Sequence, residues 1–170
     1  HTSAGFCHLQ MAQCAAPHDG DGHGDAAATA TAYRRSGRCP HYRAWMLPVH
    51  PDTGAVEACR LCHEEQDGGG AAFPRHRVRE AVCAFCACAQ PCGAACANPE
   101  CCARGRAHAY YCPTCRLWED DPHRQIYHCD GCGLCRVGRR EQYVHCDQCG
   151  MCVPKAAPHV CWGSMRDARC

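Results

Sequence analysis

The chain has few of the large apolar residues from which a protein core is usually built. Leu, Ile, Val and Phe together account for 17 of its 170 residues, and isoleucine occurs once. So low a content of large apolar side chains marks a chain that cannot bury a sufficient core of its own. Such a chain folds only if something else contributes the missing free energy, and structural zinc contributes about 10–16 kcal/mol per site at neutral pH.

The sequence also lacks features that define other classes of protein. No apolar run approaches the length of a membrane span, so we expect no membrane partner. The formal net charge is +1, and no basic stripe with interleaved aromatic residues is present, which argues against a nucleic-acid partner. No signal peptide is evident.

Cysteine and histidine are abundant instead, with 22 and 13 residues, and in one region they recur in register. Cys-x-x-Cys pairs begin at Cys112, Cys129 and Cys146, each 17 residues after the last, and His128 and His145 follow the same step. An internal repeat of metal-ligand residue types predicts zinc sites. A disulfide framework is the alternative, but it requires no histidines at ligand spacing, and Cys-x-x-Cys pairs suit it poorly.

The repeat predicts three interleaved zinc sites. A Cys-x-x-Cys pair places two thiolates about 2.3 Å from a shared zinc, and two further ligands must complete the tetrahedron. The histidine that ends each repeat and the third cysteine of the next repeat can supply them. The predicted sets are Cys112, Cys115, His128 and Cys135; Cys129, Cys132, His145 and Cys152; and Cys146, Cys149, His159 and Cys161. The structural corollary is a rod-like stack in which each zinc connects one repeat to the next.

Ligand residue types also gather upstream of the repeat, and here the sequence resembles a known family. The segments Cys-x-His-Tyr, Cys-Arg-x-Cys-His-Glu and Cys-x-x-Cys…Gln…Cys, with Gln90 in the last, resemble the CHY-type zinc finger. The stretches 127–138 and 144–152 resemble the CTCHY-type zinc finger. In tandem the two resemble the CHY/CTCHY RING-finger E3 ubiquitin ligases. The resemblance assigns these upstream metal ligands: Cys39, His41, Cys59, Cys62, His63, His76, Cys83, Cys86, Cys96 and Cys101.

These assignments give an expected domain organisation. Residues 1–36, rich in Ala, Gly, Thr and Asp, are expected to form a flexible leader. The resemblance then implies a CHY-type finger over 37–111, a CTCHY-type finger over 112–165 and the start of a RING finger over 166–170. The expected fold class is a small, metal-stabilised zinc-finger array, mostly irregular with short β-hairpins. At four ligands per ion, about five or six Zn2+ ions are expected.

The upstream finger departs from the family pattern at one of its expected sites. Met46, Asp52 and Thr53 stand where the family carries cysteines. His50 and Asp52 can substitute as ligands, since zinc accepts imidazole and carboxylate. Otherwise one site of the finger is weakened or lost.

Several cysteines leave the ligand assignment open or fall outside it. An insertion before the aromatic Tyr-Tyr-Cys segment leaves either Cys101 or Cys102 as a ligand. Cys88 and Cys92 do not fall on the motif, and we expect them to be free thiols. In the leader, ligand residue types stand at spacings that fit no known zinc-binding turn, and we expect no site there: Cys7, His8, Cys14, His18 and His23.

The resemblance implies that this stretch is the zinc-binding N-terminal portion of a RING-type E3 ubiquitin ligase that contributes to substrate recruitment. Its partners would be a protein substrate and, if a RING follows, a ubiquitin-conjugating enzyme. The alternatives are a stand-alone zinc-binding interaction module and a redox protein working through exposed cysteines, which the repeat disfavours. Reduced cysteines that ligate zinc indicate the cytoplasm or nucleus.

We expect no catalytic site in this stretch. His-x-Glu occurs at His63, and zinc deaminases combine that motif with Pro-Cys-x-x-Cys. Here Cys92 is followed by Cys96, one residue too far for the second motif. Zinc ions held by four protein ligands leave no open position for a reacting water.

Overall fold

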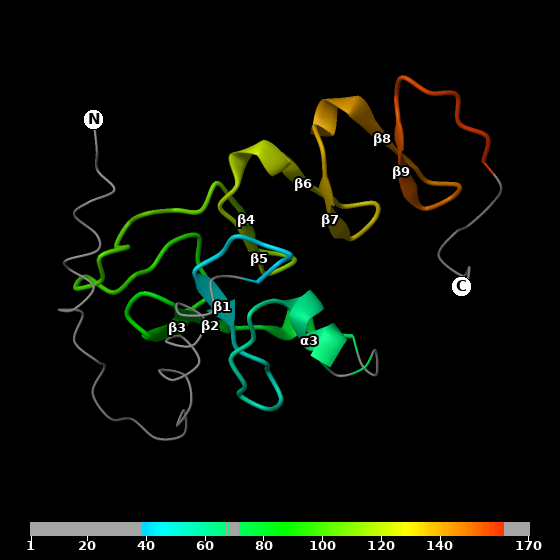
Figure 1. The fold of residues 1–170 in the computed structure, drawn as a ribbon. Coiled ribbons are helices and arrows are strands. Elements are labelled where there is room, and N and C mark those ends of the chain that lie inside the picture. The colour runs from blue at the N-terminus through cyan, green and yellow to red at the C-terminus, as the bar shows by residue number, and fades with distance from the viewer. Residues whose placement is uncertain (1–38, 67, 69–71, 162–170) are drawn as a thin grey trace, which may run out of the picture. The chain divides into compact units, whose positions relative to one another are not determined.

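The structure, a computed structural model, describes residues 39–66, 68 and 72–161 (Figure 1). It divides into two compact units, the first ending at Asp120 and the second beginning at Asp121. The expected leader over 1–36, with its candidate ligands, and the segment 166–170 lie outside the described residues.

The first unit is organised around a small antiparallel sheet in the order β1-β2-β3. Its strands are β1 (Met46–Pro48), β2 (Glu80–Cys83) and β3 (Ala89–Pro91). The helix α3 (Arg60–Gln66) and the 3₁₀ turn η1 (Arg75–Arg77) lie between β1 and β2 in the chain. A separate hairpin of β4 (Tyr110–Cys112) and β5 (Leu117–Glu119) completes the unit.

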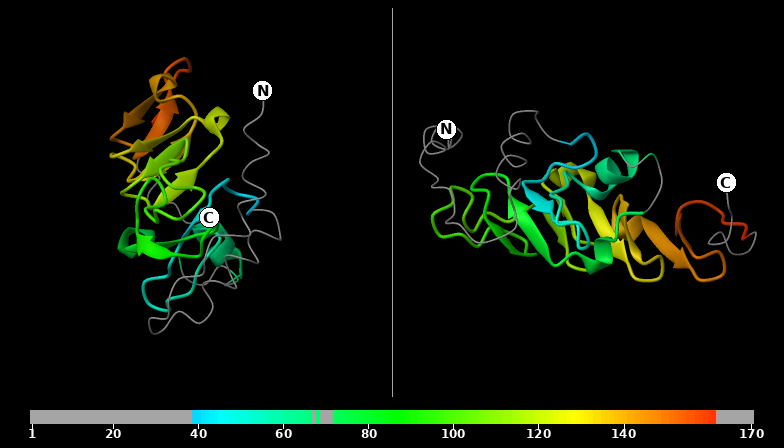
Figure 2. Two further views of the ribbon diagram at one scale, coloured as in Figure 1. Left: turned by 90° about the vertical axis from the view of Figure 1, so that its left-hand side faces the viewer. Right: turned by 90° about the horizontal axis from the view of Figure 1, so that it is seen from below.

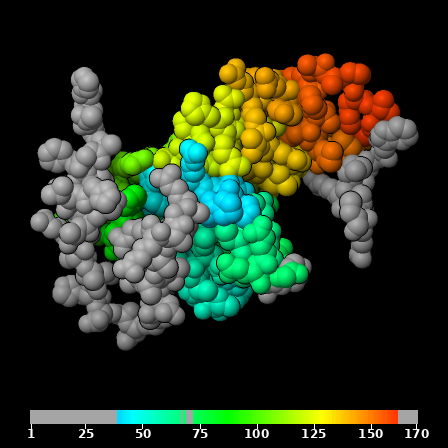
Figure 3. All heavy atoms as spheres, in the orientation of Figure 1, coloured from blue at the N-terminus to red at the C-terminus, as the bar shows by residue number. Residues whose placement is uncertain are grey.

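The second unit consists of two β-hairpins, each preceded by a 3₁₀ turn. The turn η2 (Pro122–Arg124) leads into β6 (Ile126–Cys129) and β7 (Leu134–Val137). The turn η3 (Arg140–Gln142) leads into β8 (Tyr143–Cys146) and β9 (Met151–Pro154). All views keep the two hairpins next to each other, and in the space-filling view they form successive bands in chain order (Figures 2 and 3).

The 17-residue repeat of the sequence corresponds to a repeated β-hairpin in which equivalent residues pair across the two strands. The first cysteine of each pair lies opposite an apolar residue: Cys112 opposite Leu117, Cys129 opposite Leu134, and Cys146 opposite Met151. The residue after the second cysteine of each pair has a positive φ, 50° at Arg116, 67° at Gly133 and 70° at Gly150. The expected array of short β-hairpins is therefore confirmed.

A small apolar core exists, and zinc-ligand cysteines form part of it. Met46 and Leu47 on β1 and Val82 on β2 are fully buried in the first unit. Met46 and Leu47 belong to a cluster with Trp45, Trp118 and the cysteines Cys83, Cys86, Cys96 and Cys101. Val82 packs with Val49 in a second, smaller cluster. Because seven of the eleven residues of the larger cluster are cysteines or alanines, its apolar burial is too small to replace the metal, in line with the composition.

Within the described part of the chain, none of the helices has the length and apolar character needed to cross a membrane.

Candidate metal centres

Twenty of the candidate ligands converge in five groups of four residues. In each group the sulfur and nitrogen ligand atoms all lie within 4.8 Å of one another. Three groups have the members that the sequence repeat predicts. The five are Cys39, His41, Cys59 and Cys62; Cys83, Cys86, Cys96 and Cys101; Cys112, Cys115, His128 and Cys135; Cys129, Cys132, His145 and Cys152; and Cys146, Cys149, His159 and Cys161.

The spacing of the ligand atoms fits tetrahedral zinc. With Zn–S near 2.3 Å and Zn–N near 2.0–2.1 Å, the edges of the tetrahedron are about 3.8 Å between sulfurs and about 3.6 Å between sulfur and nitrogen. The Cys83–Cys101 and Cys86–Cys96 sulfur pairs are both 3.8 Å apart. His41 Nδ1 lies 3.6 Å from Cys59 Sγ and 3.5 Å from Cys62 Sγ. The described residues therefore present five groups positioned to hold zinc, which agrees with the expected number of ions.

In the first group a loop and the start of a helix bring the ligands together. Cys59 precedes α3 and Cys62 lies in its first turn, and the backbone N–H of Cys62 donates to Cys59 Sγ at 3.4 Å. His41 turns Nδ1 toward the thiols, and its Nε2 lies 3.0 Å from Glu65 Oε1. A carboxylate on the far nitrogen fixes the ring orientation and the tautomer that leaves Nδ1 for the metal.

The second group consists of four buried cysteines, one of which is bonded to the side chain of Gln90. The Gln90 amide nitrogen donates to Cys96 Sγ at 3.3 Å, and its oxygen accepts from the backbone N–H of Ala97 at 2.6 Å. The backbone N–H of Ala103 donates to Cys101 Sγ at 3.4 Å. These donors stabilise thiolate charge in a site that water does not reach.

In the second unit one group takes ligands from both hairpins. Cys129 and Cys132 lie at the tip of β6–β7, whereas His145 and Cys152 lie on β8 and β9. His145 Nδ1 is 3.6 Å from Cys129 Sγ and 3.3 Å from Cys132 Sγ. Arg136 also reaches Cys132 Sγ, at 3.6 Å. A zinc in this group would tie the two hairpins together, as the interleaved arrangement requires.

The histidines of the repeat share one orientation. His128 and His145 turn Nδ1 toward the cysteines, while Nε2 lies 3.6 Å from Asp130 and 3.5 Å from Asp147, respectively. His159 in the last group uses the other nitrogen, with Nε2 3.5 Å from Cys149 Sγ. Cys161 closes that group, 3.9 Å from Cys146 Sγ.

Four of the groups contain one thiol that ionises easily. The hydrogen bond from Cys59 lowers the pKa of Cys39 to about 5, and that from Cys83 lowers the pKa of Cys86 to about 4. Burial opposes ionisation of Cys132, yet the hydrogen bonds it receives from Arg136 and its neighbours lower its pKa to about 6. The backbone N–H of Cys149 likewise lowers the pKa of Cys146 to about 6. The lowered pKa in each of these groups favours the thiolate, the form that binds metal.

Two predicted ligands lie outside all five groups. His63 Nδ1 is 3.1 Å from Glu57 Oε1, and its ring packs against His50 and Phe73. His76 Nδ1 is 3.0 Å from the carbonyl oxygen of Thr114. The two histidines have protein partners where the resemblance implied zinc.

The residues at the variant site have structural partners as well. His50 Nδ1 accepts from the backbone N–H groups of Asp52 and Thr53, both at 3.3 Å. Asp52 pairs with Arg77, and Met46 is fully buried on β1. Among the described residues none of these joins a group of potential ligands.

The open choice between adjacent cysteines is resolved by position. Cys101 lies in the all-cysteine group, and Cys102 does not. Cys88 and Cys92 also lie outside the groups. Glu65, Arg136 and the role of Gln90 were missed from sequence. The only signal for Arg136 is its position four residues after Cys132.

Five groups with four protein ligands each define a zinc-binding, metal-stabilised array of short hairpins. Closed four-ligand sites of cysteine and histidine are structural sites, in contrast to catalytic zinc sites, which keep a position for water.

No protein-family profile matches the chain. It is similar, however, to two proteins from Oryza sativa subsp. japonica. One is the E3 ubiquitin-protein ligase SRFP1, 34% identical over 87 residues, which cover 51% of this chain and 32% of that protein. The other is the probable E3 ubiquitin-protein ligase RZFP34, 35% identical over 94 residues, covering 51% of this chain and 30% of that protein.

A third similar protein is an uncharacterized RING finger protein from Schizosaccharomyces pombe. It is 39% identical over 86 residues, which cover 51% of this chain and 19% of that protein. The chain thus matches about a third or less of the length of these relatives. The similarity connects the zinc-binding array with proteins named as ubiquitin ligases and RING finger proteins.

Proposed function

We propose that this chain is the zinc-binding portion of a RING-type E3 ubiquitin ligase and contributes to the recruitment of its protein substrate. The observation that carries the proposal is the similarity of half the chain to two rice proteins named as E3 ubiquitin-protein ligases. The five four-ligand groups agree with it, since one further similar protein is named as a RING finger protein and RING fingers bind zinc. We assign the upstream half to the CHY type and the repeat to the CTCHY type.

The chemistry of the site assigns this portion a binding role within the ligase. Each group has four protein ligands, so its zinc would have no position for a reacting water or carbonyl. The described cysteines that lie beside a histidine nitrogen share a group of potential zinc ligands with that histidine, so we assign these pairs to metal binding and not to covalent catalysis. Ubiquitin would pass from a conjugating enzyme, bound by a RING finger, to a substrate lysine.

A ubiquitination assay with purified conjugating enzyme tests the proposal. The 170-residue chain by itself is expected to give no ubiquitin chains, whereas a longer form that also carries a RING finger is expected to form them. Removing the zinc-binding portion from the longer form should leave autoubiquitination and abolish transfer to the substrate. Activity of the 170-residue chain alone would contradict the assignment. Inactivity of both forms with zinc bound would favour a zinc-binding interaction module without ligase activity.

We further propose that the protein acts in the cytoplasm or nucleus, where thiols remain reduced and free to bind zinc. Imaging of the tagged protein, with free-thiol quantification in the purified compartment, tests that assignment.

A further inference from the structure

Lysine is almost absent from the chain. Of its 18 Lys and Arg residues, 17 are arginines, and Lys155 is the only lysine in the 170 residues. Lysine is normally among the commonest residues of a soluble protein, so arginine here occupies nearly every basic position. The two side chains carry the same charge at neutral pH, but only lysine has an amine that modifying enzymes can acylate.

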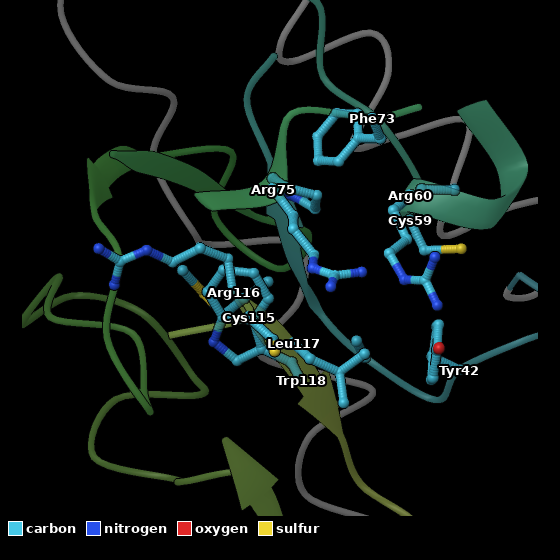
Figure 4. Close-up of a pocket in the computed structure, with 13 residues that line it drawn as sticks. Tyr42, Cys59, Arg60, Phe73, Arg75, Cys115, Arg116, Leu117 and Trp118 are labelled. Atoms are coloured by element: carbon cyan, nitrogen blue, oxygen red, sulfur yellow. The ribbon is translucent and has the colours of Figure 1, made fainter. Parts of the chain in front are cut away.

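Some of the arginines make contacts that favour a guanidinium group. Arg60, Arg75 and Arg116 line the small pocket drawn in Figure 4. Arg116 donates from two nitrogens, to the carbonyl oxygen of Val78 at 3.1 Å and to the hydroxyl of Tyr111 at 3.3 Å. A guanidinium has five N–H donors in a planar fork, whereas the ammonium of lysine is a point charge. Lysine therefore cannot replace arginine at such a position without loss of a contact.

Other arginines have no structural reason of this kind. Arg79 and Arg104 are exposed, and within 39–66, 68 and 72–161 neither side chain has a hydrogen bond or an ion pair. Lysine would serve equally well at these positions as a solvated cation. Structural contacts alone thus do not account for the rarity of lysine, and the chemical result of that rarity is a surface nearly without amines.

Lys155 provides the one lysine amine of the chain at an exposed place. It follows β9 at the start of a turn, and every residue from 154 to 160 is exposed. Its backbone N–H donates to the carbonyl oxygen of Gln142 at 2.8 Å. The turn runs between Cys152 and His159, which belong to two different ligand groups. The main chain is thus held on both sides of Lys155.

The side chain of Lys155 is free to react. Among the described residues its ammonium group has no hydrogen bond and no ion pair, and the side chain is exposed. A lysine that stabilises nothing in the fold can be acylated without loss of structure. The position therefore combines a fixed backbone with an accessible nucleophile.

We propose that Lys155 is the ubiquitin acceptor of this portion of the ligase, and that the rest of the chain escapes ubiquitin because it lacks lysine. The site rests on the proposed function, since its ubiquitin comes from the conjugating enzyme that a RING finger would hold. The free amine of Lys155 attacks the carbonyl carbon of the thioester between ubiquitin and that enzyme. A carbon–nitrogen bond forms, the carbon–sulfur bond breaks, and one amine proton ends on the released thiol.

The other nucleophiles of the chain are less suited to this transfer. A guanidinium group stays protonated in proteins and has no electron pair to offer. The cysteines of the five groups are occupied as ligands once zinc is bound. Serine and threonine hydroxyls are weak nucleophiles without an adjacent base. Ubiquitin is therefore directed to Lys155.

The test is autoubiquitination of a longer, RING-containing form with purified conjugating enzyme, followed by mass spectrometry of the Gly-Gly remnant that ubiquitin leaves on its acceptor after trypsin. Within the 170 residues we expect the remnant on Lys155. Lys155→Arg should lower the modified fraction of this portion at least about tenfold, because arginine keeps the charge and lacks the amine. Zinc content should not change, since the side chain has no partner among the described residues.

Arg79→Lys is the matched variant for the second half of the proposal. It places a lysine at an exposed position with little change in charge or size. If lack of lysine protects the surface, this variant should gain a remnant at residue 79 and keep the one at Lys155. An active Arg79→Lys form without a remnant at residue 79 would show that position protects the surface, and would overturn this half of the proposal.

Two further results would overturn the assignment of Lys155. One is an active longer form in which Lys155 carries no remnant. The other is ubiquitin that persists on this portion in Lys155→Arg, attached to a serine, threonine or cysteine. In either case the longer form still transfers ubiquitin, so the proposed function stands and only this inference fails.

Failure of the proposed function gives a different result. A zinc-loaded longer form that transfers no ubiquitin at all would refute it, and the use of Lys155 as an acceptor with it. Accessibility of the amine is measured without any ligase, by acetylating the zinc-loaded 170-residue chain with N-hydroxysuccinimidyl acetate. Lys155 should react as fast as lysine in an unstructured peptide. Slow acetylation would refute an exposed acceptor, whatever the ligase activity.

Discussion

Gly131 lies directly against the imidazole of His145. A Cβ atom at position 131 would stand 2.7 Å from the ring's Cγ, closer than real Cβ contacts come. Gly131 belongs to the Cys129-x-x-Cys132 turn, and His145 is the ligand that β8 contributes to the same group. The turn therefore has no side chain at the place where the neighbouring hairpin delivers its histidine.

Gly131→Ala is expected to weaken zinc binding by this one group about 10- to 100-fold, because the imidazole must move away from the cysteines. Competition with a chelator, followed by native mass spectrometry, measures the affinity of the weakest ion. Gln148→Ala changes the equivalent, exposed position of the next hairpin and should have no effect. Equal affinities in all three proteins would mean that His145 does not bind the metal.

The number of zinc ions per chain is expected to be five, and it should depend on some histidines only. His145→Ala should remove about one ion, because three remaining ligands hold zinc less tightly than four. His63→Ala and His76→Ala should keep all five, since their nitrogens contact Glu57 and Thr114. Native mass spectrometry with metal analysis counts the ions. Six ions in the unaltered chain and five in His63→Ala would show instead that a sixth zinc site exists and that His63 is one of its ligands.

Removal of zinc is expected to unfold both units. The buried core of the first unit includes Cys83, Cys86, Cys96 and Cys101, so loss of the metal would leave four thiols to pack among few apolar groups. Proton–nitrogen correlation spectra before and after chelation should show collapse of amide dispersion. Dispersed signals that persist for β1 and β2 would show that Met46, Leu47 and Val82 suffice without zinc.

In each hairpin turn, the residue after the second cysteine has a left-handed backbone conformation. A residue other than glycine at that position is expected to lower the stability of the fold. Gly133→Ala should destabilise the zinc-loaded protein by about 1–2 kcal/mol, because a Cβ is unfavourable at φ near +67°. Gly93→Ala serves as the control, since its nearest atoms would lie at 3.7 and 3.9 Å, an ordinary contact distance. Urea unfolding followed by circular dichroism compares the two. A midpoint for Gly133→Ala that equals that of Gly93→Ala would contradict the argument.

Much of the second unit was predictable, because its determinants are local and repeated. A Cys-x-x-Cys turn, a following glycine and a fixed return to histidine generate the same hairpin wherever they occur, as the registers at Cys129 and Cys146 demonstrate. Ligand sharing follows from the spacing once the hairpins stand next to each other. Donors outside the pattern, such as Arg136, could not be found that way, since their contacts depend on the strand twist.

The first unit was less predictable, because its ligands come from distant parts of an irregular chain. Cys62 and His63 are neighbours on α3, and successive residues on a helix point in different directions. One helix therefore cannot direct both at the same ion, and His63 turns toward Glu57 and Phe73. At Cys101 and Cys102 the choice depends on a tight turn, in which the N–H of Ala103 bonds to Cys101. Neither outcome is encoded in the spacing of ligand residue types.

The sharing of ligands between β6–β7 and β8–β9 restricts how the length of the array can change during evolution. The stretch from Cys129 to His145 carries four ligands, which belong to two different groups. If a gene duplicated this stretch in register, the longer chain would gain one complete ligand set and no orphaned thiol. A duplication or deletion that breaks this register would leave incomplete ligand sets on both sides of the junction. Arrays of this kind can therefore lengthen or shorten over evolutionary time, but only by whole repeats.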